Sequence, residues 1–152
     1  MEYHHNIYEK LDTDAMQVLI DYNCCSIPID VFSLANKLNM KLIKFSSLTK
    51  EQLNALSGQE CISIKVLFNN GNYEIRTYYD DAISINRQRF NIAHEIKHVI
   101  YEEWEYDDEK EKHANHFARS LLLHPALLIC LLEFDISTLS KKFVISEEAV
   151  SY

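Results

Sequence analysis

Two histidines four residues apart, His94 and His98 in the stretch HEIKH, are the residues of this sequence best placed to do chemistry. In a helix, residues four apart lie one turn apart on the same face, so both imidazoles can bind one metal ion. Glu95 lies about 80° to one side of the pair, because each helical residue is rotated by about 100° from the last. There it can accept a proton from metal-bound water without binding the ion. The spacing predicts a zinc site with Glu95 as general base; the alternative is a surface helix carrying two histidines.

A zinc site of this kind needs a third protein ligand, and Glu102 on the same helix face cannot supply it. Residues 94 and 102 are about 12 Å apart along a straight helix, because each residue rises by about 1.5 Å. Zinc–ligand bonds are only about 2 Å long. The third ligand must therefore come from another element.

Glu111, on a second helix expected to begin near Asp108, is the best candidate for the third ligand. It falls on the apolar stripe of that helix, whereas His113 and His116 fall off the stripe and are interpreted as surface residues. A glutamate on an inward face is costly unless it is paired or bound to a cation. The alternative is that Glu111 reaches solvent from the first turn of the helix. The stripe consists of Ala114, Phe117, Ala118, Leu121 and Leu122.

Two histidines and one glutamate would leave a fourth position for water, which is the arrangement of catalytic rather than structural zinc sites. Glu95 would take the proton of that water and later pass it to the leaving amine. Asn115 is a candidate to hydrogen-bond one of the ligands. Lys97 is expected to carry its ammonium group to solvent on its long stem. The sequence does not select an oxyanion donor among Tyr78, Tyr79 and Tyr101.

Composition and charge limit the class of protein. With 152 residues, the chain predicts one domain, and a formal charge of −8 argues against a large phosphate-binding face. No apolar leader or uninterrupted membrane span is recognised, and the four cysteines show no Cys-x-x-Cys spacing. We therefore expect a cytoplasmic protein with reduced cysteines that binds neither nucleic acid directly nor a membrane.

The elements that must position the site are helices at both ends and strands in the middle. This order predicts an α+β fold in a single domain, residues 1–152, with N-terminal helices, a small antiparallel sheet, two active-site helices and a C-terminal helical tail. Asn69–Asn72 (NNGN) indicates a hairpin between two of the strands. The predicted helices are 11–22, 28–38 and 87–103 with a fourth from about 108, and the predicted strands are 41–45, 61–68, 73–79 and 82–86.

Two stretches, RQRFNIAHEIKH and EKHANHFARSLL, together resemble the paired motifs of the ImmA/IrrE family of metallopeptidases. The upstream stretch IPIDVFSLANKLNMKLIKF is similar to the Pro-Ile-Asp helix and first strand of that family. Two departures are Lys97, where members commonly have glycine, and LLLHP, where the family ends its second helix with Leu-Leu-x-Pro. The matching positions are Arg89, Phe90, Ala93, His94, Glu95 and His98, then Glu111, Ala114, Asn115, Phe117 and Ala118.

The resemblance implies a zincin-like fold, a bound Zn²⁺ or another divalent ion such as Mn²⁺, and proteolysis inside the cell. It further implies that the substrate is a helix-turn-helix transcriptional repressor of a mobile element, phage or stress response. The alternative hypothesis is a catalytically weak antirepressor that keeps the fold and acts by sequestering its partner. Lys97 and the altered LLLHP stretch motivate that alternative.

Overall fold

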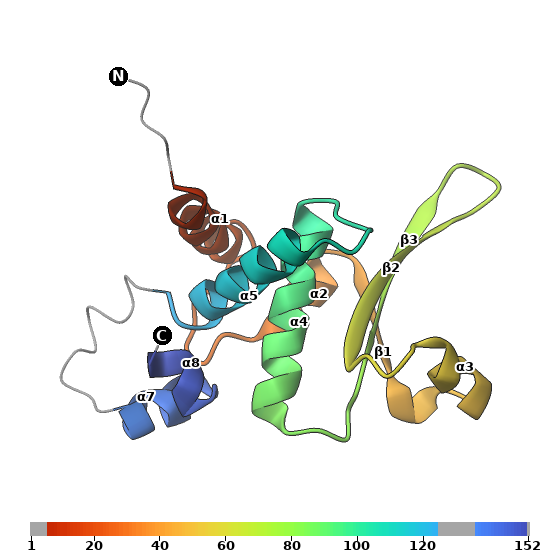
Figure 1. The fold of residues 1–152 in the computed structure, drawn as a ribbon. Helices are drawn as coiled ribbons and strands as arrows, with labels where there is room; N and C mark the ends of the chain where they lie inside the picture. The colour runs from red at the N-terminus through yellow and green to blue at the C-terminus, as the bar shows by residue number, and fades with distance from the viewer. Residues whose placement is uncertain (1–5, 125–135, 152) are drawn as a thin grey trace.

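A three-stranded sheet and the helices packed beside it form the described part of the chain, residues 6–124 and 136–151 of a computed structural model (Figure 1). The α+β class predicted from the order of the elements is therefore confirmed. In chain order the elements are α1 (Ile7–Asp21), α2 (Val31–Lys37), β1 (Met40–Lys44), the 3₁₀ turn η1 (Phe45–Ser47), α3 (Lys50–Ala55), β2 (Cys61–Leu67), β3 (Tyr73–Tyr79), α4 (Ile85–Ile100), α5 (Asp108–Leu122), α7 (Ile136–Phe143) and α8 (Glu147–Ser151).

The sheet is mixed, so the prediction of an antiparallel sheet was wrong. Its strand order is β1-β3-β2, with β3 parallel to β1 and antiparallel to β2. The predicted hairpin joins β2 to β3, and Gly71 at its turn has φ +85°, a conformation that glycine adopts without strain. The segment with η1 and α3 connects β1 to β2. These two strands lie on either side of β3 and run in opposite directions.

No strand forms at residues 82–86, contrary to the sequence prediction. The Asp80 carboxylate accepts a hydrogen bond from the Ala82 backbone N–H at 2.9 Å, and the Ser84 hydroxyl accepts one from the Arg87 N–H at 3.3 Å. Such local side-chain bonds offer the backbone an alternative to a strand ladder. Ser84 caps α4, which therefore begins at Ile85, two residues before the predicted start.

The two N-terminal helices have side-chain caps that set where they begin. Asn6 caps α1, which therefore begins at Ile7, four residues before the predicted start at Leu11. Asp30 caps α2 by accepting from the Ser33 N–H at 3.0 Å, so this helix begins after Pro28 and Ile29 rather than at them. The predicted end of α2 is close to the observed one, since Asn39 follows with φ +59°.

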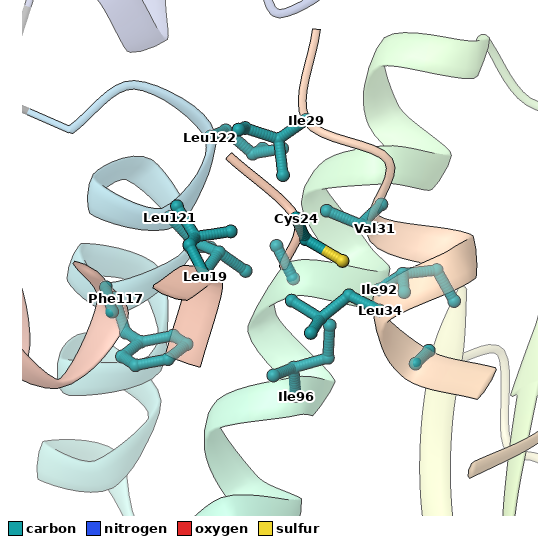
Figure 2. Packing of buried hydrophobic residues seen from close by; sticks show 14 of the residues in the cluster. Leu19, Cys24, Ile29, Val31, Leu34, Ile92, Ile96, Phe117, Leu121 and Leu122 are labelled. Atoms are coloured by element: carbon teal, nitrogen blue, oxygen red, sulfur yellow. The ribbon is translucent and has the colours of Figure 1, made fainter. Parts of the chain in front are cut away.

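The core lies between α1, α2, α4 and α5 (Figure 2). Ile92, Ile96 and Val99 on α4 are buried, and so is every member of the apolar stripe predicted on α5. Burying one such side chain contributes about 1.5–3 kcal/mol, so this packing fixes how α4 and α5 lie against each other. The face of α4 that carries the histidines is thereby turned toward the first turn of α5.

The C-terminal helices α7 and α8 confirm the predicted helical tail, and Arg89 of α4 holds it. The guanidinium donates to the backbone oxygens of Phe143, at 2.6 Å, and Val144, and it also donates to Ile29 at 2.6 Å. The motif position Pro125 lies outside the described residues. None of the described helices is long and apolar enough to cross a membrane.

Candidate metal centre

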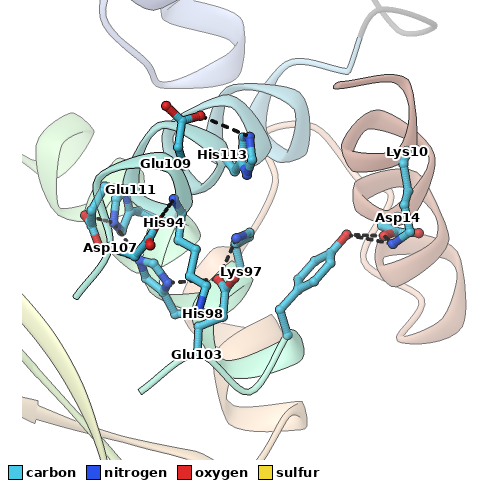
Figure 3. A network of polar contacts seen from close by, with 12 residues as sticks. Lys10, Asp14, His94, Lys97, His98, Glu103, Asp107, Glu109, Glu111 and His113 are labelled. Carbon is cyan, nitrogen blue, oxygen red and sulfur yellow. Dashed lines mark hydrogen bonds and ion pairs between the residues drawn. The ribbon is translucent and has the colours of Figure 1, made fainter. Parts of the chain in front are cut away.

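Helices α4 and α5 bring the three predicted metal ligands together. The Nε2 atoms of His94 and His98 lie 3.1 Å apart. The carboxylate of Glu111 contacts both rings, with Oε2 at 2.9 Å from Nε2 of His94 and Oε1 at 3.0 Å from Nε2 of His98. Figure 3 shows the three side chains converging between the two helices. The donor atoms lie within 4.8 Å of one another, so this group could hold a metal ion.

The donor set fits a zinc-type ion in both chemistry and spacing. Two imidazole nitrogens and one carboxylate form one of the ligand sets of catalytic zinc sites. Tetrahedral ligands at bonds of about 2.0–2.1 Å are separated by about 3.3 Å. The contacts of 2.9, 3.0 and 3.1 Å lie only slightly below that separation, so small side-chain shifts accommodate an ion.

Both imidazoles are held at their Nδ1 atoms by side chains outside the ligand group. Nδ1 of His94 lies 2.7 Å from Oδ1 of Asn115, and Nδ1 of His98 lies 3.2 Å from Oε1 of Glu103. These oxygens are acceptors, so each ring donates its Nδ1–H and presents the Nε2 lone pair to the site. Partners of this kind fix the tautomer and direction of metal-binding histidines. Asn115 was among the sequence candidates for this role.

Glu103 was missed by the sequence reasoning, and the end of α4 explains how it reaches His98. The N–H of Glu102 bonds to the carbonyl of Val99 at 3.2 Å, and that of Glu103 bonds to the carbonyl of His98 at 2.8 Å. This is a Schellman turn, which usually has glycine in the left-handed position. Here Glu102 occupies it with φ +54°. Without a glycine, the sequence carries no signal for the turn.

The prediction that Lys97 sends its ammonium group to solvent was wrong. Its side chain is 2% exposed, and Nζ lies 2.5 Å from Oε1 of Glu103. Nζ also lies over the ring of Tyr101, 4.9 Å from the centroid. The turn after α4 folds a carboxylate and an aromatic ring over the lysine, which satisfies the charge within the protein. Lys97 does not line the cavity described next.

Beside the ligand group lies a cavity of about 470 Å³ between α4, β2 and the segment that follows α4. Glu95 is 8% exposed and lines this cavity together with the three ligands, as expected for a base beside the site. Among the described residues, the Glu95 carboxylate has no hydrogen-bond partner, so it can bind a proton of a molecule in the cavity. The other lining residues are Gln59, Glu60, Cys61, Ile62, Ser63, Ile64, Phe90, Asn91, Glu103, Trp104, Glu105, Tyr106 and Asn115.

Cys61 is a thiol in the wall of the cavity. Burial raises the pKa of the Cys61 thiol well above its ordinary value, and the negative charge of Glu95 raises it further. The same electrostatic effect indicates that Cys61 and Glu95 lie near each other across the cavity.

The remaining sequence candidates lie elsewhere. None of Tyr78, Tyr79 and Tyr101 lines the cavity, and the Tyr101 hydroxyl instead donates to Asp14 of α1. Tyr106, from the segment after α4, is a tyrosine that does line it. His113 and His116 lie outside the group of His94, His98 and Glu111, and they are half-buried rather than exposed. The Nε2 atom of His116 lies 2.8 Å from the Asp12 carboxylate of α1.

Comparison with known proteins identifies a similar fold and no family. No protein-family model matches the chain, and no curated protein matches it. A solved structure described as a Mycobacterium tuberculosis transcriptional regulator is similar, with a TM-score of 0.57 and 14% sequence identity over 93% of this chain. The chain spans 44% of the length of that protein, less than half. At this identity the likeness concerns the fold, and it agrees with the α+β arrangement described above.

Proposed function

We propose that this chain is a zinc-dependent endopeptidase of zincin-like fold. The observation that carries the proposal is the convergence of His94, His98 and Glu111 beside a cavity lined by the buried carboxylate of Glu95. Zinc, when bound by such a set, leaves a position for water and lowers the pKa of that water to about 7.

Glu95 is the residue of this chain that moves protons in the proposed reaction. Its carboxylate takes a proton from the attacking water and gives it to the amine of the departing peptide. Its burial and the neutral Cys61 thiol nearby lower the polarity around it, which strengthens the interaction of the carboxylate with a charged transition state. A general base of this kind contributes about 10²–10⁴-fold to the rate.

Strand β2 is suited to hold an extended peptide across the cavity. It is an edge strand of the sheet, and its residues Cys61–Ile64 line the cavity beside the ligands. An edge strand offers backbone N–H and C=O groups that pair with an added strand. The peptide would then lie along β2 with its scissile bond over His94 and Glu95.

The resemblance of the paired motifs to the ImmA/IrrE family supports a substrate for this activity, namely a helix-turn-helix repressor. In the structure the motif residues have distinct places: His94, His98 and Glu111 converge, Asn115 contacts His94, and Arg89 anchors the C-terminal segment. The solved neighbour is described as a transcriptional regulator, which is in keeping with a role in gene control.

The test is to express the chain together with a candidate repressor, as wild type and as Glu95→Gln. Cleavage by wild type should fall about 10²–10⁴-fold in the variant while zinc content is kept, because Gln cannot take up the proton. The matched control is Glu109→Gln on α5, which makes the same change at a side chain that is 69% exposed. It should cleave like wild type.

Two outcomes would count against the proposal. Equal cleavage by wild type and Glu95→Gln would remove Glu95 from the mechanism. An intact repressor held in a stoichiometric complex by both proteins would support the antirepressor hypothesis. That hypothesis was motivated by Lys97 and the altered LLLHP stretch. Lys97 does not line the cavity, and Pro125 of LLLHP lies outside the described residues.

A further inference from the structure

Lys97 is a buried cation directly next to a candidate metal ligand. Its side chain is 2% exposed, and its partner Glu103 is 11% exposed. An ion pair taken out of water in this way costs desolvation free energy, and a well-packed apolar pair is often as stable. Packing alone therefore gives no reason for a lysine at this position, and the neighbouring groups must be considered.

One oxygen atom joins Lys97 to the metal site. Oε1 of Glu103 accepts from Nζ of Lys97 at 2.5 Å and from Nδ1 of His98 at 3.2 Å. The backbone N–H of Glu103 also donates to the carbonyl of His98 at 2.8 Å. Glu103 is thus fixed against His98 through both backbone and side chain, and Figure 3 shows the three side chains in contact.

The lysine determines where that carboxylate rests. A carboxylate with 11% exposure and no countercharge would gain free energy by turning toward water. His98 would then lose the acceptor of its Nδ1–H, and its ring could rotate or change tautomer. With the ammonium in place, the carboxylate stays close to the ring, which makes the opposite nitrogen a stronger metal ligand.

Tyr101 holds the ammonium from the other side. Nζ of Lys97 lies 4.9 Å from the ring centroid, and the hydroxyl of the same ring donates to Asp14 of α1. A cation over an aromatic face is attracted to it, most strongly away from water. The contacts therefore run in one series from α1 to the ligand: Asp14, Tyr101, Lys97, Glu103, His98.

We propose that Lys97 is a positioning residue for the metal ligand His98 and that it acts through Glu103. The inference rests on the metal site of the proposed function. In that site the buried ion pair of Lys97 and Glu103 sets the strength of metal binding. The pair is accordingly coupled to the site and is more than a local stabiliser of the turn after α4.

The experiment measures the zinc affinity of the purified full chain by competition with a chelating dye, beside the thermal unfolding of the metal-free protein. Lys97→Met keeps the length of the side chain without its charge, and Glu103→Gln keeps the shape of the acceptor without its charge. Each should bind zinc about 10–100-fold more weakly than wild type. The double variant should be no weaker than the poorer single variant, because both act through one contact.

The matched control is Lys41→Met on β1, since Lys41 also pairs with a glutamate, Glu74 at 3.4 Å, but is 59% exposed. It should bind zinc like wild type. If Lys97→Met does not fold, Lys97→Arg keeps the cation and should recover most of the affinity, while Glu103→Gln remains weak.

Three results would overturn the inference. The first is zinc affinity within twofold of wild type in folded Lys97→Met and Glu103→Gln, which would leave the pair a structural role only. The second is full additivity in the double variant. The third is absence of zinc binding by wild type, which would remove the proposed function as well, so failure of the two ideas can be told apart.

Discussion

Oδ1 of Asn115 lies 2.7 Å from Nδ1 of His94, so a residue on the middle of α5 sets the orientation of a candidate ligand on α4. Glu111 is four residues before Asn115, one turn away on the same helix face. One face of α5 thus supplies both a candidate ligand, Glu111, and the support of another, His94. The apolar packing of α4 against α5 therefore fixes the positions of Glu111 and Asn115 relative to His94 together.

Removal of the Asn115 amide should weaken metal binding without unfolding the protein. Asn115→Ala leaves the His94 Nδ1–H without its acceptor, and loss of such a partner typically costs 10–100-fold in affinity. The measurement is a zinc titration with a competing dye. Asn91→Ala is the control, because Asn91 also lines the cavity but donates to Glu60 at 3.1 Å instead. Unchanged affinity in folded Asn115→Ala would contradict the assignment.

Glycine at position 102 should stabilise the protein. Glu102 adopts φ +54°, which costs a residue with a Cβ about 1–2 kcal/mol. Part of the gain is lost because glycine has more freedom in the unfolded chain, so Glu102→Gly should raise the free energy of unfolding by about 0.5–1 kcal/mol. Urea denaturation measures it. Glu102→Ala keeps the Cβ and should show no gain; an equal gain in both variants would argue against backbone strain.

Replacement of Arg89 should destabilise the fold. Arg89 is 6% exposed, and its guanidinium donates to backbone oxygens of Ile29, Phe143 and Val144. Arg89→Met leaves these buried acceptors without a donor, which should cost about 3 kcal/mol in urea denaturation. Arg87→Met is the matched control, because Arg87 is 63% exposed and its ion pair with Glu60 should contribute less than about 1 kcal/mol. Similar losses in both variants would contradict the anchoring role.

Stability should fall steeply at high pH because of Tyr101. Burial, and then the hydrogen bond to Asp14, raise the pKa of Tyr101 to about 12, above its ordinary value of 10.0. A group whose pKa is higher in the folded state stabilises it fully below the unfolded pKa. That contribution is lost as the pH rises from about 10 to about 12. Free energies of unfolding measured across this range should decline less in Tyr101→Phe than in wild type; parallel declines would refute the prediction.

The ligand group could be predicted because it depends on helical periodicity alone. His94 and His98 share a face by their spacing, and Glu111 was selected by its position on an apolar stripe that the structure buries as expected. Both inferences need only the geometry of a regular helix. Asn115, which follows Glu111 by one turn, was a candidate to hydrogen-bond a ligand, but its position next to the stripe fitted packing or capping equally well.

What could not be predicted depends on how the chain leaves its regular elements. Glu103 reaches His98 through a Schellman turn that lacks the usual glycine, so no residue type in the sequence indicated this turn. The burial of Lys97 could not be predicted from its long stem, because it depends on residues after α4 that fold back over the side chain. The strand expected at 82–86 does not form because the side chains of Asp80 and Ser84 accept local backbone hydrogen bonds. The parallel pairing of β1 with β3 could not be predicted either, because it depends on the path of the chain between these strands, and the pattern of apolar residues does not encode that path.

Helix α1 is synthesised well before α5, the helix against which it packs. The bond between His116 and Asp12 joins residues 104 positions apart, and α1 buries Leu11, Ala15 and Leu19 in the core shared with α5. At roughly 5–20 residues per second of synthesis, α1 leaves the ribosome about 5–20 seconds before its partner exists. During that interval its apolar face must remain exposed or be covered by another protein. The newly made chain is therefore most prone to aggregate before α5 emerges.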